Sequence, residues 1–218
     1  MIQKYKFPGI YKSGKDFATL AFTEGSVYGE KVIKDKNKIY RIWDPTRSKF
    51  AAALRNSISY SPFDSGSIVL YLGASTGTTV SHISDIVSRS GIIYAIEFAE
   101  RVFRPLLQLS QKRKNIAPLL ADARKPETYA WIEECDIVFC DIADPQEIEI
   151  FIRNSKQFLK KSGYGIVSIK SQSIDVTKPP KEIYDTSIGQ LKLNGFTIID
   201  FKDLEPYEKH HGFVLVKK

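Results

Sequence analysis

Apolar runs alternate with stretches of helical spacing along the chain from about residue 60 onward. Seven runs have the length and composition of buried strands, at residues 68–72, 92–96, 117–120, 137–139, 165–169, 196–201 and 213–216. Between most of them the apolar positions recur at helical intervals, in residues 78–87, 102–112, 148–159 and 183–193. This alternation predicts an α/β fold of the doubly wound class, in which helices cover both faces of a largely parallel, seven-stranded sheet.

The last two predicted strands differ from the others because no helical pattern separates them. Residues 202–212 connect them, and a parallel neighbour would need a crossover of about a dozen residues or more. We therefore expect the seventh strand to be antiparallel and to join the sheet at its edge.

The first 45 residues have a different character. Residues 17–22 and 38–43 are rich in aromatic and β-branched side chains, glycines punctuate the neighbouring segments, and no helical period appears. Helical spacing begins only after Pro45, over residues 47–58. The chain is therefore predicted to contain a small β-rich N-terminal domain, residues 1–55, followed by the α/β domain, residues 56–218.

Composition places the chain among globular proteins. Of its 218 residues, 43% are hydrophobic and 26% are charged, which excludes disordered, collagen-like and disulfide-scaffold proteins. Cys135 and Cys140 lie in an apolar stretch, at a spacing typical of neither a metal clip nor a secreted scaffold, so we expect buried thiols and no metal site. Neither a signal-peptide run nor an 18-residue apolar stretch occurs, and we expect a cytoplasmic protein without a membrane span.

The charge is unevenly distributed along the chain. The net charge is +7; residues 1–60 hold 12 Lys and Arg against 5 Asp and Glu, while residues 61–218 hold 20 of each. A polyanion or an acidic partner near the N-terminal part is one explanation, and a solvated lysine-rich surface is the other.

A glycine loop follows the first strand of the α/β domain. In an open α/β sheet, ligands bind beyond the carboxyl ends of the strands. Gly73 suits a tight turn there, and Gly77 leaves room for a ligand against the backbone at the start of the next helix. The loop lacks the lysine of a P-loop and the G-x-G-x-x-G pattern of dinucleotide enzymes, so nucleotide phosphate binding and an NAD-dependent oxidoreductase are both disfavoured.

Acidic residues stand at the ends of the next three strands. Glu97, 24 residues after the first glycine of the loop, is positioned to bind both hydroxyls of a ribose. Asp122 could accept a hydrogen bond from an adenine amino group while Ala123 offers its N–H to the ring, and the fourth strand leads into the segment from Asp141 to Asp144. Any one of these carboxylates could instead cap a helix. With the glycine loop they form the arrangement of class I (Rossmann-like) methyltransferases, whose cofactor S-adenosyl-L-methionine carries a ribose, an adenine and a cation but no phosphate.

Seven stretches, in the expected order, resemble the fibrillarin family in its archaeal form. They are Val27-Tyr-Gly-Glu30, Arg41-Ile-Trp-Asp-Pro-Thr-Arg-Ser-Lys49, Leu70-Tyr-Leu-Gly-Ala-Ser-Thr-Gly-Thr-Thr-Val-Ser-His82, Tyr94-Ala-Ile-Glu-Phe98, Asp122-Ala-Arg-Lys-Pro126, Ile169-Lys-Ser-Gln-Ser-Ile-Asp175 and Leu204-Glu-Pro-Tyr-Glu-Lys209. The resemblance implies an RNA 2'-O-ribose methyltransferase that uses S-adenosyl-L-methionine and is the catalytic subunit of a box C/D guide ribonucleoprotein acting on rRNA or tRNA. The implied partners are a Nop-type scaffold protein, a kink-turn-binding ribosomal-type protein, the box C/D guide RNA and the target RNA.

By position, the resemblance implies a cofactor site built from the glycine loop and the acidic strand ends. Its residues would be Gly73, Ala74, Gly77, Thr78, Thr79, Glu97, Phe98, Asp122, Ala123, Asp141, Ile142, Ala143 and Asp144. Two departures from the family pattern occur. Ala-Ser-Thr replaces the usual Ala-Ala-Ser between the two glycines, and Asp144 replaces the usual glutamine. The added negative charge at Asp144 either strengthens binding of the cationic cofactor or alters the placement of RNA.

Methyl transfer to a ribose hydroxyl requires an in-line approach and removal of the hydroxyl proton. Asp141 and Lys170 end two predicted strands and would face the same cleft. Lys170 is either the base, if burial or a nearby cation such as Lys49 favours loss of its proton, or the group that orients the hydroxyl and stabilises the developing oxyanion. The four residues Lys49, Asp141, Lys170 and His211 resemble the Lys-Asp-Lys constellation of ribose methyltransferases with a variable fourth member, for which His210 is the alternative to His211.

A second hypothesis is a non-catalytic RNA-binding or scaffold protein that keeps the fold and has lost turnover. Asp144 would then be a sign of that loss, and the protein would not bind S-adenosyl-L-methionine in a calorimetric titration.

The charge distribution leads to a first prediction. If the basic N-terminal segment contacts guide or target RNA, reversing Lys and Arg residues within 1–60 will weaken RNA-dependent methyl transfer and flatten its dependence on salt. The slope of the logarithm of the RNA-binding constant against the logarithm of the salt concentration should fall by about 0.7–0.9 for each RNA phosphate that the variant no longer neutralises. Unchanged activity and an unchanged salt slope in those variants would show that the segment is only a solvated surface.

Overall fold

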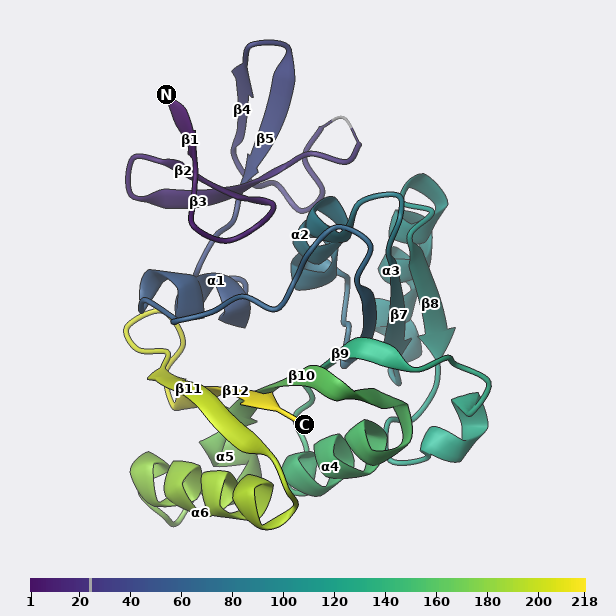
Figure 1. The fold of residues 1–218 in the computed structure, drawn as a ribbon, viewed down its shortest axis with the longest axis vertical. Helices are drawn as coiled ribbons and strands as arrows, with labels where there is room; N and C mark the ends of the chain where they lie inside the picture. The colour runs from purple at the N-terminus through teal and green to yellow at the C-terminus, as the bar shows by residue number, and fades with distance from the viewer. Residues whose placement is uncertain (24) are drawn as a thin grey trace.

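The computed structural model describes residues 1–23 and 25–218, and it contains two sheets (Figure 1). The first sheet is antiparallel, in the order β1-β2-β3-β5-β4. Its strands are β1 (Ile2–Lys4), β2 (Ile10–Ser13), β3 (Asp16–Leu20), β4 (Val32–Asp35) and β5 (Lys38–Ile42). The prediction of a β-rich N-terminal part is confirmed.

The second sheet has seven strands in the order β11-β12-β10-β9-β6-β7-β8. These are β6 (Ile68–Leu72), β7 (Ile92–Glu97), β8 (Ile116–Leu120), β9 (Cys135–Cys140), β10 (Leu159–Lys170), β11 (Thr197–Asp203) and β12 (His211–Lys217). The helices are α1 (Lys49–Arg55), α2 (Thr78–Val87), α3 (Glu100–Lys112), the short 3-10 helix η1 (Pro126–Tyr129), α4 (Glu147–Phe158), α5 (Ser171–Ile174) and α6 (Pro180–Leu193). The doubly wound α/β class is therefore confirmed.

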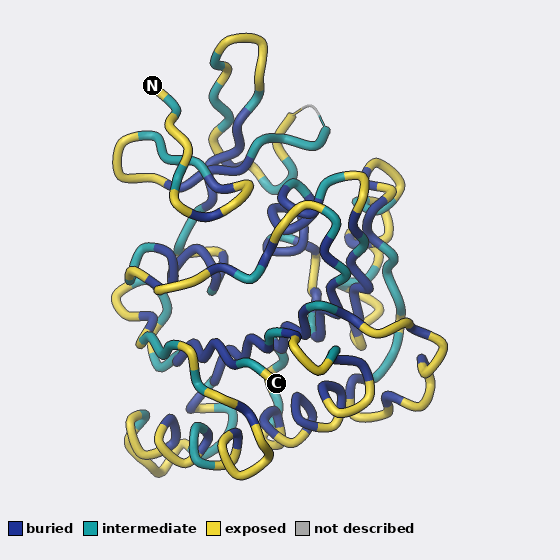
Figure 2. Tube along the Cα trace, viewed as in Figure 1, coloured by how far each residue is buried: buried dark blue, intermediate teal, exposed yellow. Residues whose placement is uncertain are grey.

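Alternating side chains of the central strands enter two different cores. Val69 and Tyr71 of β6 join the core formed with α1 and α2, while Leu70 and Leu72 join the core formed with α4 and α6, as the period of two in a strand requires. Figure 1 shows α1, α2 and α3 on one side of the sheet and α4 and α6 on the other. In Figure 2 the buried trace follows the strands and α2, whereas the tip of the β4–β5 hairpin and the outer turns of α6 are exposed.

The position of the seventh strand departs from the prediction. β12 is antiparallel to both neighbours, as expected, but it lies between β10 and β11 instead of at the edge. Its residues from Gly212 to Val216 are buried, and an apolar strand of this kind gains more from two neighbours than from one. The edge position falls to β11, whose residues are all exposed or only partly buried.

The helix between the two sheets is also shorter than predicted. α1 ends at Arg55 instead of continuing to residue 58, because Ser57 adopts a left-handed φ of 61° that reverses the chain. α1 packs against both β3 and β12, and its apolar residues belong to a core shared with Phe17 of the first sheet and Val80 of α2. The division at residue 55 stays a prediction.

A buried polar network joins the first sheet to α2. Both carboxylate oxygens of Asp85 on α2 accept from the N-terminal part: Oδ2 from the Thr19 hydroxyl at 2.6 Å and from Arg41 Nη1 at 2.8 Å, and Oδ1 from the Phe22 N–H at 2.7 Å. Arg113, after α3, donates to the same Oδ1 at 2.6 Å. The side chains of Asp85, Arg41 and Arg113 are fully buried, so the charges compensate one another inside the protein.

Arg41 is also paired with Glu30. Its Nε lies 2.6 Å from Glu30 Oε1, and the Glu30 carboxylate further accepts the N–H groups of Val27 and Tyr28. Burial by itself would raise the pKa of Glu30, but these N–H groups and Arg41 outweigh it and hold the pKa at about 2. Glu30 is therefore ionised in the folded protein at neutral pH.

Two simpler expectations can be compared directly with the fold. Cys135 and Cys140 are free, buried thiols, as predicted. Within residues 1–23 and 25–218, no helix is both long and apolar enough to cross a membrane.

The network predicts a large loss of stability when Arg41 is removed. Arg41→Met leaves Glu30 and Asp85 short of a buried partner, and we expect the free energy of unfolding at pH 7 to fall by about 3–5 kcal/mol. The lowered pKa of Glu30 contributes stability above pH 4.5 that is lost as the pH falls toward 2. The difference in the free energy of unfolding between the wild type and Arg41→Met, measured by denaturant titrations, should therefore become smaller as the pH falls from 4.5 toward 2. Arg47→Met, which removes an exposed arginine of the same region, is the control and should change stability by less than about 1 kcal/mol; equal losses in both variants would contradict the role of the network.

Candidate functional site

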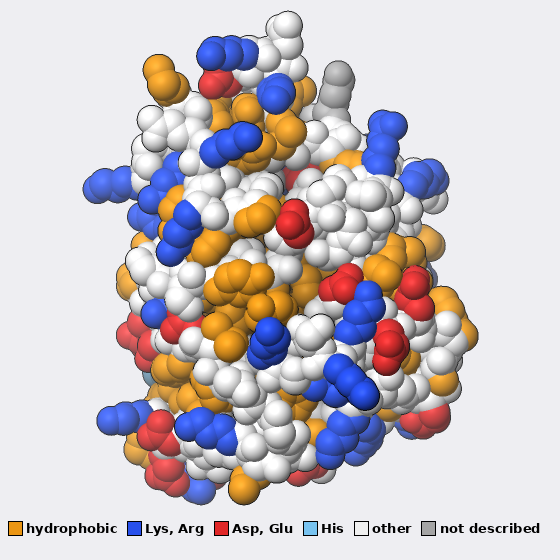
Figure 3. All heavy atoms as spheres, in the orientation of Figure 1, with side chains coloured by type: hydrophobic (Ala, Val, Ile, Leu, Met, Phe, Trp, Pro, Cys, Tyr) orange, Lys and Arg blue, Asp and Glu red, His pale blue; other side chains and the backbone are white. Residues whose placement is uncertain are grey.

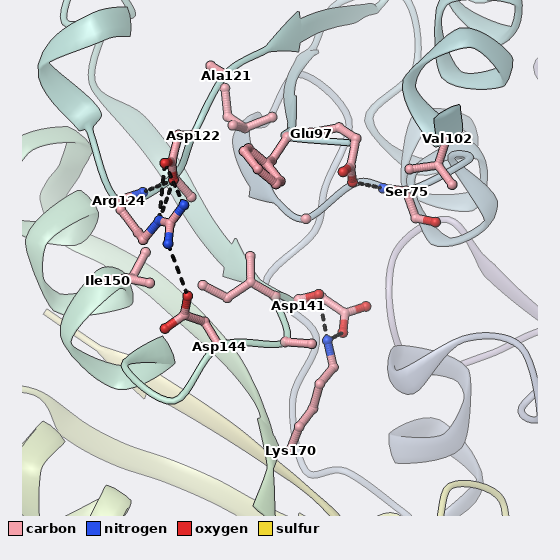
Figure 4. A pocket seen from close by; sticks show the side chains of 16 residues that line it. Ser75, Glu97, Val102, Ala121, Asp122, Arg124, Asp141, Asp144, Ile150 and Lys170 are labelled. Atoms are coloured by element: carbon pink, nitrogen blue, oxygen red, sulfur yellow. Dashed lines mark hydrogen bonds and ion pairs between the residues drawn. The ribbon is translucent and has the colours of Figure 1, made fainter. Parts of the chain in front are cut away.

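A cavity of about 380 Å³ opens at the carboxyl ends of β6, β7, β8 and β9 (Figure 4). Apolar side chains of Ile96, Val102 and Ile150 form part of its wall, and the polar groups around it are mostly acidic. This is the edge of the sheet at which open α/β proteins bind ligands, and its volume is within the range of small-molecule sites, about 300–1,000 Å³.

Most of the predicted cofactor residues line this cavity. Those that line it are Gly73, Glu97, Phe98, Asp122, Ala123, Asp141, Ile142, Ala143 and Asp144, together with Lys170 from the predicted catalytic group. Four predicted residues of the glycine loop and the helix after it are not among the described lining residues: Ala74, Gly77, Thr78 and Thr79. Thr78 borders a separate cavity of about 300 Å³ against α3.

The two glycines of the loop are required for packing. A Cβ atom at Gly73 would lie 2.7 Å from the carbonyl oxygen of Asp141, so the glycine allows the loops after β6 and β9 to approach each other. A Cβ atom at Gly77 would lie 2.5 Å from Leu109 of α3. Both residues have φ above +80°, a region that favours glycine. At Gly77, Leu109 of α3 occupies the space into which a Cβ atom would project, and the predicted cofactor contact of this residue stays a prediction.

Thr79 has a structural contact that fixes the start of α1. Its hydroxyl donates to the Ser48 hydroxyl at 3.0 Å, and the Trp43 ring N–H donates to the same oxygen at 2.9 Å. Ser48 immediately precedes α1, whose first residue is Lys49. The start of α1, and with it Lys49, is thereby attached to α2.

Glu97 ends β7 as a buried residue, and the backbone anchors its carboxylate. Oε2 accepts the N–H of Ser75 at 2.7 Å, and Oε1 accepts the N–H of Ala99 at 2.8 Å. Each carboxylate oxygen can accept more than one hydrogen bond. Glu97 is therefore held in one orientation and keeps acceptor capacity for a ligand in the cavity.

Arg124 links two of the acidic strand ends. Its Nε and Nη2 donate to the two oxygens of Asp122 at 3.0 and 2.9 Å, and its Nη1 lies 3.9 Å from Asp144 Oδ2 (Figure 4). Its guanidinium also stands 5.8 Å from the ring centre of Phe98, which is 67% exposed. The hydrogen bonds from Arg124 lower the pKa of Asp122. The negative charge of Asp144 is therefore partly balanced by a cation of the same chain.

Asp141 is the centre of the predicted catalytic group. Lys170 Nζ lies 3.0 Å from Asp141 Oδ1 and donates to the Asp141 carbonyl oxygen at 2.7 Å. Lys49 Nζ lies 3.7 Å from the same Oδ1, and the Tyr71 hydroxyl donates to Oδ2 at 3.2 Å. Burial is the main reason that the pKa of Tyr71 is raised far above its usual value, so the phenol remains a donor. Three residues far apart in the sequence thus converge on one carboxylate.

His211 belongs to the outer part of this group. Glu208 connects it to the rest, lying 3.9 Å from Lys49 Nζ and 4.0 Å from His211 Nδ1. His211 Nδ1 also lies 2.7 Å from the carbonyl oxygen of Lys209. Burial, assisted by the charges of Lys49 and Lys170, lowers the pKa of His211, so its ring is neutral at neutral pH. His210, the alternative, contributes its carbonyl oxygen to Ser171.

Comparison with known proteins agrees with this geometry. The fibrillarin family model matches residues 1–218. The chain belongs to the fibrillarin family. A curated relative from Thermococcus sibiricus, named fibrillarin-like rRNA/tRNA 2'-O-methyltransferase, is 46% identical over 224 residues, which cover 100% of this chain and 99% of the relative.

Two solved fibrillarin structures share the fold closely. Aeropyrum pernix fibrillarin in complex with natively bound S-adenosyl-L-methionine matches with a TM-score of 0.91 and 38% identity, over 99% of this chain and 97% of that one. A fibrillarin/Nop5p complex matches with a TM-score of 0.89 and 38% identity, over 98% of this chain and 99% of that one.

Several residues of this fibrillarin site were missed by the sequence argument. Arg124 stands two residues after Asp122, within a stretch that matches the family, and a cation next to a predicted ligand-binding acid was a signal that could have been used. Tyr71 and Glu208 carried no comparable signal, because a tyrosine inside an apolar strand and a glutamate in a polar loop are both ordinary. Ser75 contributes through its backbone N–H, which side-chain identity does not reveal.

Arg124 and Asp144 lead to a pair of opposite predictions for cofactor affinity. Removing a cation beside the cavity should favour a cationic ligand, so we expect Arg124→Ala to bind S-adenosyl-L-methionine up to about fivefold more tightly, and Asp144→Asn to bind it less tightly by a similar factor. Both changes should shrink in 0.5 M salt. Calorimetric titration measures these affinities, with Arg104→Ala on the exposed side of α3 as a control. Weaker binding by Arg124→Ala would instead mean that the arginine holds Asp122 in place for the cofactor.

Proposed function

We propose that the chain is the S-adenosyl-L-methionine-dependent 2'-O-ribose methyltransferase of a box C/D guide ribonucleoprotein, acting on rRNA or tRNA. The observation that carries the proposal is the convergence of Lys49 and Lys170 on Asp141 at the edge of a cofactor-sized cavity. Family membership and the name of the Thermococcus relative support the RNA specificity.

The residues around the cavity suit this cofactor. Its described lining contains four carboxylates, those of Glu97, Asp122, Asp141 and Asp144, with Arg124 and Lys170 as the only cations. Acidic groups favour a ligand that carries a cation and lacks phosphate. We assign Glu97 to the ribose hydroxyls, Asp122 and the N–H of Ala123 to the adenine, and Asp141 through Asp144 to the methionine part. The cofactor-bound structure of the Aeropyrum relative supports the assignment of the cavity.

The chemistry divides between the cofactor and the Asp141 group. When bound, the cofactor supplies a methyl group made electrophilic by a sulfonium. An ammonium has three donors and no acceptor, so Lys170, while ion-paired with Asp141, can orient a ribose hydroxyl and stabilise negative charge on its oxygen but cannot remove its proton. We therefore assign Lys170 to orientation and charge stabilisation, and the Asp141 carboxylate to acceptance of the proton.

Lys49 and His211 take supporting roles in this proposal. Lys49 lies farther from Asp141 than Lys170 does, at 3.7 Å against 3.0 Å, and it is shared with Glu208. It is suited to hold the carboxylate in place from the side of α1. His211, neutral and connected through Glu208, is assigned to the outer part of the group.

The proposed partners are a Nop-type scaffold protein, a kink-turn-binding protein, the guide RNA and the target RNA. The fibrillarin/Nop5p complex supports the first of these. The distribution of charge supports the last two: on the face seen in Figure 3, Lys and Arg side chains are spread over the upper part, which β1 to β5 form, with few acidic side chains among them. Phosphate backbones are bound by such surfaces.

The proposal predicts that Asp141 and Lys170 are required for turnover. In a guide complex reconstituted with each variant, Lys170→Ala and Asp141→Ala should lower the single-turnover rate of methyl transfer by about 10²–10⁴-fold, the usual contribution of a positioned acid–base group. Lys170→Ala should retain cofactor binding in a calorimetric titration, because the ammonium contacts Asp141 and not the ribose or adenine end of the cavity.

Lys161→Ala is the matched control, since Lys161 is an exposed lysine of the same strand, β10. Its rate should equal that of the wild type. Wild-type rates in Lys170→Ala and Asp141→Ala would remove both residues from the reaction. Absence of any cofactor binding by the wild-type chain would favour the non-catalytic scaffold instead.

A further inference from the structure

Glu147 is a buried acid directly behind the catalytic group. It is the first residue of α4 and has no exposed surface. Its Oε1 accepts the backbone N–H of Lys170 at 2.8 Å. Its Oε2 is also buried and has no hydrogen-bond partner among the described residues. A side chain of this kind needs an explanation, because most buried polar groups are hydrogen-bonded.

The backbone N–H of Lys170 has no acceptor on the β9 side of the sheet, and Glu147 supplies one. The last residue of β10 in register with β9 is Val167, opposite Cys140, so the end of β10 extends beyond that neighbour. On its other side, Lys170 is in register with His211 of β12. The N–H of Lys170 would be left without a partner at this point, at a substantial free-energy cost, and Glu147 accepts it. The backbone from which the Lys170 ammonium extends toward Asp141 is thereby held in place.

The surroundings of Glu147 favour its uncharged form. Burial is the largest influence and raises its pKa to about 8, although the N–H and the ammonium of Lys170 oppose the rise, while Asp141 and Asp144 add to it. The remaining titratable neighbour is the Cys140 thiol, which donates to the Glu147 carbonyl oxygen at 3.9 Å and whose own pKa is raised by burial. At neutral pH, Glu147 is therefore a carboxylic acid.

We propose that Glu147 is a positioning residue for methyl transfer: by accepting the Lys170 N–H it fixes the backbone at Lys170, and it thereby holds the Lys170 ammonium on Asp141. This inference rests on the proposed function. Ionisation of Glu147 should then disturb this arrangement. A carboxylate at Glu147 draws the ammonium of Lys170 away from Asp141, and the alignment of the group that orients the ribose hydroxyl is lost.

The test uses pH profiles of three variants in the reconstituted guide complex, with the rate of methyl transfer measured from pH 6 to 9.5. Glu147→Gln keeps an acceptor for the Lys170 N–H and cannot ionise. It should match the wild type at pH 7 and lack a two- to tenfold fall that the wild type shows as the pH rises through about 8. Glu147→Ala removes the acceptor and should lower kcat at least tenfold at every pH, with the KM for the cofactor changed by less than twofold. Glu149→Gln, an exposed glutamate of the same helix, should follow the wild type throughout.

A second measurement covers the case in which Glu147→Ala fails to fold. A raised carboxyl pKa means that the folded protein retains a proton that the unfolded chain releases, so stability is full below about pH 4.5 and is lost as the pH rises through about 8. The Tm of Glu147→Gln relative to that of the wild type should therefore increase from pH 6 to pH 9. Activity profiles of wild type and Glu147→Gln that superimpose over the whole range would overturn the proposal, as would a fully active Glu147→Ala. No methyl transfer by the wild-type complex would contradict the proposed function itself.

Discussion

The buried carboxylate of Asp85 is the contact on which the arrangement of the two sheets depends. It lies on α2 and accepts hydrogen bonds from Thr19, Phe22 and Arg41 of the N-terminal part. Because the Thr19 hydroxyl donates its proton to Asp85, the neutral ring of His82 donates to Thr19 from Nδ1 and accepts from the Tyr28 hydroxyl at Nε2. Removing a partner from a charge buried this deeply is strongly destabilising, so the network favours this relative orientation of the two sheets.

That orientation determines where Lys49 stands. The chain leaves the first sheet at β5 and passes through Ser48, the residue just before α1. Trp43 and Thr79 both donate hydrogen bonds to the Ser48 hydroxyl. Lys49 therefore reaches Asp141 from a part of the chain that is remote in sequence from β10, the strand that carries Lys170. The N-terminal part thus supplies one of the four residues of the proposed catalytic group, in addition to the surface proposed for RNA.

Charge is organised differently at the two ends of the cavity. At one end, Arg124 bridges Asp122 and Asp144 and partly offsets two carboxylates that would otherwise face a cationic ligand alone. At the other end, two lysines meet at Asp141, and behind them Glu147 stays uncharged through burial. One of these two lysines, Lys49, comes from residues 1–60, the part of the chain in which 12 basic residues outnumber 5 acidic ones.

The amino-acid sequence by itself determined the fold class, the approximate positions of the strands and helices in the α/β part, and the acidic strand ends that line the cavity. These follow from apolar periodicity, and from the rule that the carboxyl ends of parallel strands share one edge of a sheet. Tertiary structure alone decided that β12 lies inside the sheet and that Gly77 packs against α3. It also decided that Arg124 bridges Asp122 and Asp144, and that Glu147 accepts a hydrogen bond from the Lys170 N–H. Each of these depends on which residues meet across long separations in the chain, and such contacts follow from the packing of whole elements, which leaves no local pattern in the sequence.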